Sequence, residues 1–514
     1  MNGAESLIRT AIAAGVEVCF ANPGTTEMAI VAALDSTDGL RPILGLFEGV
    51  CTGAADGYGR MAEKPALTLV HLGPGFANGI ANLHNARRAR SPIVNLIGDH
   101  ATHHVGHDAP LTSDIVSLAT PVSGWVRSVV SSASLAGTTA DAIAAAGRAP
   151  GQIATLIIPS DCQWDPVERH AAPVEPTAPP VVSSDAIKLA AESIRKGNKV
   201  AFFLGGTALR ARGLKAVARI AAKSGCHLIC ETFPARLERG AGMPALDRLP
   251  YFPEQAIEAL KPFDTIVIAG AKKPVAFFGY PDYPSQLIPE GVNTAILADP
   301  TDDVPAALEA LASEMGAPVS IATPSKVSRP ERPVGRLDAM TAGAAIAATM
   351  PEGAIVMDEA ATTGLPFLAA SGSAPPHTYL SLTGGAIGQG LPCATGAAVA
   401  CPDRRVIAYQ ADGSGMYTIQ ALWTQARESL NVTTVLCNNH SYRILQVELA
   451  RAGVAEPGRK ARSLTSLSNP DIEWTSLARG LGVPAVRVET AEALTLELER
   501  SLATPGPTLI EMIL

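Results

Sequence analysis

Oxygen-bearing side chains follow two apolar, strand-like runs near the C-terminal end of the sequence. Asp412-Gly413-Ser414 comes after residues 404–410, and Asn438-Asn439 comes after a β-branched run at 432–437. An amphipathic helix predicted over about 416–430 would complete a βαβ unit. Ligands bind at the carboxyl edge of such sheets, where an Asp and an Asn together would suit Mg²⁺. The Ser414 hydroxyl and nearby amides could hold phosphates, or the Asp could simply cap the helix.

The composition is that of a globular protein. Of 514 residues, 47% are apolar and 17% are charged, which allows two to four domains. A net charge of −8 without a basic stripe argues against nucleic acid as a partner. We expect no membrane partner, because no apolar run has spanning length and the N-terminus lacks a signal pattern. Eight scattered cysteines indicate reduced thiols in a cytoplasmic protein.

Two Pro-rich segments divide the chain, one at about 166–182 and the other at about 317–334. The three blocks between them alternate helix and strand patterns. We therefore predict an α/β protein with three doubly wound parallel-sheet domains, at residues 1–165, 183–318 and 335–514.

The segment from Asp412 to Asn439 resembles the cofactor motif of thiamine diphosphate (ThDP) enzymes, G-D-G followed at a distance by N-N. Three α/β blocks also resemble the pyrimidine-binding, middle and pyrophosphate-binding domains of the decarboxylase and acetolactate synthase family. The resemblance implies that Asp412, Asn439 and the Ser441 carbonyl bind Mg²⁺, and that Gly413 and Ser414 contact ThDP. Ala411 replaces the first Gly of the motif, so we expect an ordinary backbone conformation there.

Glu48 follows a strand-like run at 43–47 and precedes a small-residue helix at 51–62, a segment that resembles the one after the catalytic glutamate of this family. A carboxyl group hydrogen-bonded to the aminopyrimidine ring favours the imino tautomer, which takes the proton from the thiazolium carbon. In the family this glutamate reaches the cofactor of a neighbouring subunit. The resemblance therefore implies a homodimer or homotetramer with active sites at the subunit interface.

Two further N-terminal segments resemble substrate-facing parts of the family. His71 precedes a G-P-G-x-x-N loop at 73–78, at the position of an active-site His in benzoylformate decarboxylases. It could relay protons or simply satisfy buried backbone groups. Thr25 follows a Pro-Gly turn whose next side chain faces substrate in the family.

Four histidines, His100, His103, His104 and His107, fall within one loop. Cys or acidic partners at metal-ligand spacing are missing. Pyruvate decarboxylases carry a His pair in this loop, so His103 and His104 are candidates for substrate contact; otherwise they are polar loop residues.

Residues 382–392 resemble the family's small-residue loop, in which a bulky apolar side chain holds ThDP bent. Ile387 occupies that position. The bent form brings the imine nitrogen close to the thiazolium carbon, and such proximity accelerates the reaction. We expect Thr383, Gly384 and Gly385 to reach the cofactor through backbone amides. Leu445 lies where pyruvate decarboxylases carry a Glu and where benzoylformate decarboxylases and acetolactate synthases are apolar.

The resemblance implies a 2-oxo acid decarboxylase or carboligase of the acetolactate synthase type, using ThDP and Mg²⁺ without FAD. Thr25, His71 and Leu445 favour a benzoylformate decarboxylase-like enzyme as the alternative. A catalytically weak paralogue with a binding or regulatory role is a further alternative, because Ala411 departs from the motif and Phe278 stands where benzoylformate decarboxylases place a second His. A nicotinamide dehydrogenase is disfavoured, because Gly205-Gly206 is not a GxGxxG fingerprint.

Overall fold

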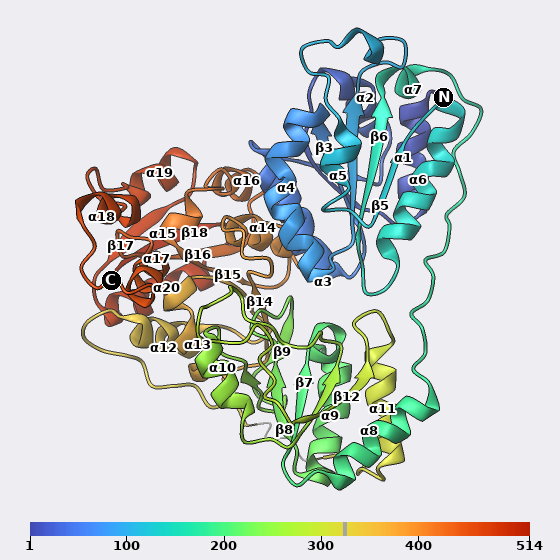
Figure 1. Cartoon of the computed structure of the whole chain (residues 1–514). Helices are drawn as coiled ribbons and strands as arrows, with labels where there is room; N and C mark the ends of the chain where they lie inside the picture. Colours follow the sequence, from blue (N-terminus) through green and yellow to red (C-terminus); the bar gives the residue numbers. More distant parts are fainter. Residues whose placement is uncertain (322–325) are drawn as a thin grey trace. The chain divides into compact units, whose positions relative to one another are not determined.

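The computed structural model describes residues 1–321 and 326–514 (Figure 1). The chain divides into two compact units. Unit 1 comprises Met1–Thr177, Arg329–Ser371 and Ser381–Leu514, and unit 2 comprises Ala178–Ser328 and Gly372–Leu380. The predicted α/β class with parallel sheets is confirmed. The three-domain boundaries stay a prediction, and residues 322–325 of the second Pro-rich segment lie outside the described residues.

The N-terminal part of unit 1 is a six-stranded parallel sheet in the order β2-β1-β3-β4-β6-β5. Its strands are β1 (Val18–Asn22), β2 (Arg41–Leu44), β3 (Ala66–His71), β4 (Ile93–Asp99), β5 (Trp125–Ser128) and β6 (Ile153–Pro159). Its helices are α1 (Gly3–Ala13), α2 (Met28–Ser36), α3 (Glu48–Ala62), α4 (Leu72–Ala89), α5 (Ile115–Ala119), α6 (Ser132–Gly147) and α7 (Ser160–Trp164).

Helices cover both faces of this sheet, because successive side chains of a buried strand point to opposite sides. Leu69 belongs to the apolar core beneath α1, α2 and α6. Val70, the next residue, belongs to the core beneath α3, α4 and α5. Figure 1 shows α1 and α6 on one side of the sheet and α3 and α4 on the other.

The C-terminal part of unit 1 holds five parallel strands in the order β17-β18-β16-β15-β13. They are β13 (Ile355–Glu359), β15 (Val406–Ala411), β16 (Val432–Asn438), β17 (Ala485–Val488) and β18 (Thr508–Ile513). The helices are α12 (Ala339–Thr349), α13 (Leu365–Ala370), α14 (Gly390–Ala400), α15 (Asp412–Gly415), α16 (Ala421–Arg427), α17 (Arg443–Arg451), α18 (Arg459–Thr465), α19 (Trp474–Gly480) and α20 (Ala491–Ala503).

Helices α3 and α14 pack against each other and join the two parts of unit 1. A Cβ on Gly57 would lie 1.9 Å from the Cys393 carbonyl oxygen, and one on Gly396 would lie 1.8 Å from that of Ala54. The helix backbones can approach this closely only because both positions are glycine.

A buried ion pair lies beside this contact. Arg60 donates to the Asp56 carboxylate from Nε at 2.8 Å and from Nη2 at 2.7 Å, and both side chains are almost fully shielded from solvent. Arg60 also donates to the Ser381 carbonyl at 2.8 Å and to Thr383 Oγ1 at 3.0 Å. The pair therefore connects α3 to the segment that leads into the 382–392 loop.

Unit 2 contains a five-stranded parallel sheet in the order β10-β8-β7-β11-β12 and an antiparallel pair, β9 with β14. Its strands are β7 (Val200–Leu204), β8 (His227–Cys230), β9 (Leu237–Arg239), β10 (Asp247–Arg248), β11 (Thr265–Ala269), β12 (Asn293–Ala298) and β14 (His377–Ser381). Its helices are α8 (Ser184–Lys196), α9 (Ala211–Ser224), α10 (Pro253–Leu260) and α11 (Val304–Glu314). Phe277 packs on Phe233, Tyr251 and Phe278.

Three local predictions are wrong. The helix expected over 416–430 covers only Ala421–Arg427, because turns with i→i+3 hydrogen bonds precede it and β-branched Thr418 and Ile419 disfavour a helix. Gly73-Pro74-Gly75 forms the first turn of α4 rather than a loop, a place where Pro costs no helical hydrogen bond. Strand β2 ends at Leu44, so Glu48 begins α3 instead of ending a strand.

Within the described residues, helices long and apolar enough to cross a membrane are absent. The eight cysteines are free thiols, and all except Cys401 are buried. Burial raises the pKa of Cys19 and of Cys393 to about 12.

Replacing Arg60 tests the buried ion pair. Arg60→Ala would leave the Asp56 carboxylate buried without its cation, which typically costs about 3–5 kcal/mol. Scanning calorimetry should show a clearly lowered unfolding midpoint. Arg41→Ala is the matched control, because Arg41 is half-exposed and its pair with Glu428 should contribute about 0–1 kcal/mol. Equal effects of the two substitutions would contradict the assigned role of the pair.

Candidate functional site

The turn after β15 brings Asp412 and Asn439 together. The Asp412 carboxylate is buried; it accepts from Gly413 N at 2.8 Å and from Asn439 N at 3.2 Å. Burial raises the pKa of Asp412, which means that this carboxylate is poorly solvated as an anion. A cation bound beside it would offset that cost, so the position fits a metal ligand.

The chain after β16 presents oxygen atoms next to Asp412. Asn438 is the last residue of the strand, and His440 adopts a left-handed conformation with φ 54°. Asn439 Oδ1 accepts from Ser441 N at 3.0 Å and from Ser441 Oγ at 3.1 Å. A carboxylate with amide and carbonyl oxygens is a donor set for a hard cation such as Mg²⁺. In the described part of the chain, no group of three or more His, Cys, Asp or Glu side chains could hold a metal.

The glycine and the alanine of the motif meet different backbone requirements. A Cβ on Gly413 would lie 2.3 Å from the Tyr442 ring, so only glycine fits beneath that side chain. Ala411 has φ −80° and ψ 150°, an extended conformation open to any residue. The prediction of an ordinary backbone at Ala411 is confirmed, and the substitution leaves the turn intact.

The segment from Thr383 to Gly388 is held by α4. Asn85 Nδ2 donates to the Ala386 carbonyl at 2.7 Å, and Thr383 Oγ1 donates to the Asn85 carbonyl at 2.8 Å. A Cβ on Gly384 would lie 2.5 Å from Asn85 Oδ1, while Gly385 has φ 78°. The loop therefore needs glycine at 384 because of the close contact and at 385 because of the positive φ. The Ile387 side chain in the same loop is half-buried.

Glu48 and His71 both lie close to Gly75. A Cβ on Gly75 would lie 3.0 Å from Glu48 Oε1 and 3.4 Å from His71 Cβ. Glu48 Oε2 accepts from Asn78 Nδ2 at 3.0 Å. The structure thus brings two of the predicted catalytic residues close to the same glycine, where a larger side chain would contact both.

Glu27 is a residue that the sequence reasoning missed. Its side chain is fully buried, and its Oε2 lies 2.9 Å from His71 Nδ1 and accepts from Gly24 N at 2.6 Å. Thr26 Oγ1 donates to Glu27 Oε1 at 2.6 Å and lies 3.2 Å from His71 Nδ1. The signal in the sequence was the Gly-x-x-Glu spacing of a capped turn.

The other predicted substrate contacts are exposed. Thr25 is exposed, and the hydroxyl beside His71 belongs to Thr26 instead. His103 and His104 lie on an exposed loop after β4, where the His104 ring centroid is 5.3 Å from that of His100. Leu445 in α17 is 46% exposed.

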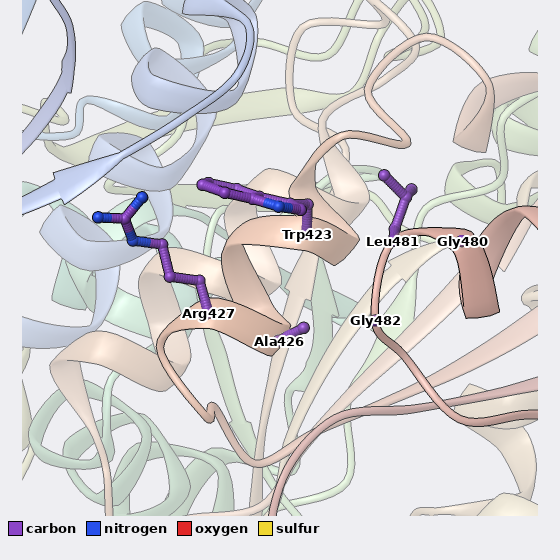
Figure 2. Close-up of a pocket in the computed structure, with 6 residues that line it drawn as sticks. All are labelled: Trp423, Ala426, Arg427, Gly480, Leu481 and Gly482. Atoms are coloured by element: carbon purple, nitrogen blue, oxygen red, sulfur yellow. The ribbon is translucent and has the colours of Figure 1, made fainter.

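A pocket of about 500 Å³ lies between α16 and the end of α19. Figure 2 shows its lining residues, with the Trp423 ring close to the Arg427 side chain; the guanidinium carbon is 5.2 Å from the ring centroid. None of the lining residues is a predicted site residue, so this pocket does not account for the cofactor motifs.

Two family models match the chain. The thiamine pyrophosphate enzyme N-terminal TPP binding domain matches residues 1–118, and the C-terminal TPP binding domain matches residues 366–512. A Mycobacterium tuberculosis protein provisionally named acetolactate synthase large subunit IlvX is 50% identical over 100% of this chain and 99% of its own length. Benzoylformate decarboxylase of Pseudomonas aeruginosa is 29% identical, over 97% of this chain and 96% of its own.

The structural comparison agrees with these sequence matches. The thiamine diphosphate-dependent 4-hydroxybenzoylformate decarboxylase of Rhodococcus jostii RHA1 has a TM-score of 0.88 at 25% identity, and the match covers 100% of this chain and 99% of that one. The resemblance to ThDP enzymes is thereby confirmed over the whole length of the sequence. The chain belongs to the thiamine pyrophosphate enzyme family and is related to acetolactate synthases and benzoylformate decarboxylases.

Proposed function

We propose that the protein is a ThDP- and Mg²⁺-dependent enzyme that decarboxylates a 2-oxo acid. The observation that carries the proposal is the placement of Glu48 and His71 close to Gly75, with buried Glu27 beside His71 Nδ1. Such a cluster offers two proton-handling groups at the carboxyl edge of a parallel sheet, where ligands of this fold bind.

The C-terminal residues would hold the cofactor. Asp412, Asn439 and the Ser441 carbonyl would bind Mg²⁺, and the Gly413–Ser414 amides would bind the pyrophosphate. Amides of residues 383–385 and the Ile387 side chain would orient the rings. When bound, ThDP supplies an electron sink for loss of CO₂ from the 2-oxo acid.

The N-terminal residues would handle protons. Glu48 would hold a proton on its carboxyl group and exchange it with the aminopyrimidine ring. Because His71 Nδ1 is engaged by Glu27 Oε2, Nε2 is the ring nitrogen left to exchange a proton with substrate. A carboxylate that orients an imidazole in this way fixes its useful tautomer.

Two fates of the decarboxylated substrate are supported by different observations. Carboligation of the acetolactate synthase type is supported by the name of the 50% identical relative and by the apolar, accessible Leu445. Release of an aldehyde is supported by the Glu27–His71 pair, which can deliver a proton, and by the aryl 2-oxo acid named for the structural relative. The direct role of Thr25, His103 and His104 in substrate contact is part of the same proposal.

The working form would be a cytoplasmic homodimer or homotetramer with active sites at subunit interfaces and no flavin. The reduced, buried thiols are consistent with a reducing compartment. One of the two arguments for a catalytically weak paralogue was the departure at Ala411. That argument is weakened, because Ala411 leaves the motif turn intact.

We expect the purified protein, with ThDP and Mg²⁺, to release CO₂ from a 2-oxo acid. Pyruvate, 2-oxobutyrate and benzoylformate should be offered separately, with identification of the products by mass spectrometry. Acetolactate from pyruvate would establish carboligation, and benzaldehyde from benzoylformate would establish simple decarboxylation. Absence of CO₂ from every acid, with ThDP bound, would sink the proposal and favour the weak paralogue.

Glu48→Gln tests the proton-handling role. Loss of an acid–base group typically lowers kcat by about 100-fold to 10,000-fold, and we expect ThDP to remain bound in calorimetry because the Gln keeps the shape. Glu63→Gln, at the exposed C-terminal end of the same helix, is the matched control and should keep full turnover. Near wild-type turnover of Glu48→Gln would refute the assignment.

Gly384→Ala tests the loop that would orient the cofactor rings. The added Cβ would meet Asn85 Oδ1 and Cα, so the loop must move, and we expect the Kd for ThDP to rise about tenfold or more. Gly137→Ala is the control, because nothing lies within 4 Å of its Cβ position in α6. Unchanged ThDP affinity in Gly384→Ala would exclude a role for this contact in cofactor binding.

A further inference from the structure

A buried carboxylate at the end of β13 binds three successive backbone amides of the Ile387 loop. Glu359 is 3% exposed. Its Oε1 accepts from Gly388 N at 2.7 Å and from Gln389 N at 3.2 Å, and its Oε2 accepts from Gly390 N at 2.6 Å. These amides directly follow Ile387 and lead into α14, so the carboxylate fixes the path of the chain just after the proposed cofactor-bending side chain.

The same carboxylate connects to the turn that carries Asp412. Glu359 pairs with Gln410 across neighbouring strands β13 and β15. Gln410 is fully buried, and its Nε2 donates to Glu359 Oε2 at 3.0 Å and to Ser414 Oγ at 2.6 Å. A continuous chain of hydrogen bonds therefore runs from the Ile387 loop through Glu359 and Gln410 to Ser414.

The Glu359 carboxylate faces four N–H donors and is packed closely against the loop. The four donors to the Glu359 carboxylate are N–H groups, which an acceptor-only carboxylate satisfies. Burial raises the pKa of Glu359 above its usual range, and the hydrogen bonds from Gln410 and from the three amides offset only part of that rise. A Cβ on Gly390 would lie 2.1 Å from Gln410 Oε1 and 2.8 Å from Glu359 Oε2, so the loop sits directly against both side chains.

We propose that Glu359 is a positioning residue for the ThDP reaction, which holds the Ile387 loop and the Asp412–Ser414 turn in a fixed relation. The loop needs such an external partner to keep one conformation, because it contains Gly384, Gly385 and Gly388, the last two at positive φ. The inference rests on the proposed function, since it concerns the same cofactor site. Glu359 acts through the loop amides and through Gln410, not by touching the substrate.

Hydrogen exchange of the protein without cofactor tests the loop contact directly. Amides 388–390 should be protected in the wild type and should exchange at least about tenfold faster in Glu359→Ala, with a smaller effect in Glu359→Gln, which keeps one acceptor oxygen. Val356→Ala is the matched control, because Val356 is buried in the same strand with its side chain on the opposite face. It should lower thermal stability without exposing these amides. Equal protection of amides 388–390 in wild type and Glu359→Ala would overturn the proposal.

Cofactor binding and turnover test the functional consequence. Glu359→Gln should raise the Kd for ThDP, measured by calorimetry with Mg²⁺ present, by about tenfold. It should also lower kcat when ThDP is saturating, whereas Val356→Ala should leave both unchanged. If the wild type binds ThDP and Glu359→Gln has an unchanged Kd and kcat, this inference is overturned and the proposed function still stands. Failure of the wild type to bind ThDP would overturn the proposed function itself.

Discussion

The Asp56–Arg60 ion pair on α3 is a buried interaction whose hydrogen bonds help to connect the two sheets of unit 1. Desolvating two charges is expensive unless hydrogen bonds satisfy the remaining polar atoms. Here Ser91 and Gln389 donate to Asp56, while Arg60 reaches the Ser381 carbonyl and Thr383. The partners come from both halves of the unit. The polar atoms of the pair are therefore fully hydrogen-bonded only when α3 and the segment before α14 are both in place. The pair favours this arrangement over misassembled ones.

The loop around Ile387 depends on this assembly. Asn85 holds it from α4, and Glu359 holds it from β13. A third contact comes from the turn before α16, where Thr418 Oγ1 donates to the Gly388 carbonyl at 2.9 Å. A segment rich in glycine has a high conformational entropy when free, so it needs several external partners to keep one shape. Those partners belong to elements far apart in the sequence.

Strand positions and the edge at which the ligands meet could be predicted from the sequence, because they follow from short-range patterns. Strand β16 contains the predicted run at 432–437, and the meeting of Asp412 with Asn439 follows from parallel strands ending at one edge. The break before α16 could not be read from periodicity, since Thr418 leaves the helix to bond a loop carbonyl thirty residues away. Glu359 was missed because only the fold brings its loop amides and Gln410 near. The role of Glu27 was missed because its contact with His71 joins residues that are 44 positions apart. Thr26 rather than Thr25 places its hydroxyl beside His71, because residues 25–27 form a 3-10 turn that could not be predicted from the sequence.

The burial of the thiols has a chemical consequence. Only the thiolate reacts readily with oxidants and alkylating agents. Because burial raises the pKa of Cys19 and Cys393 to about 12, both thiols stay protonated at neutral pH. Both side chains are also fully shielded from solvent. Cys393 lies in the helix contact that joins the two sheets, so its inertness keeps that contact insensitive to the redox state of the surroundings.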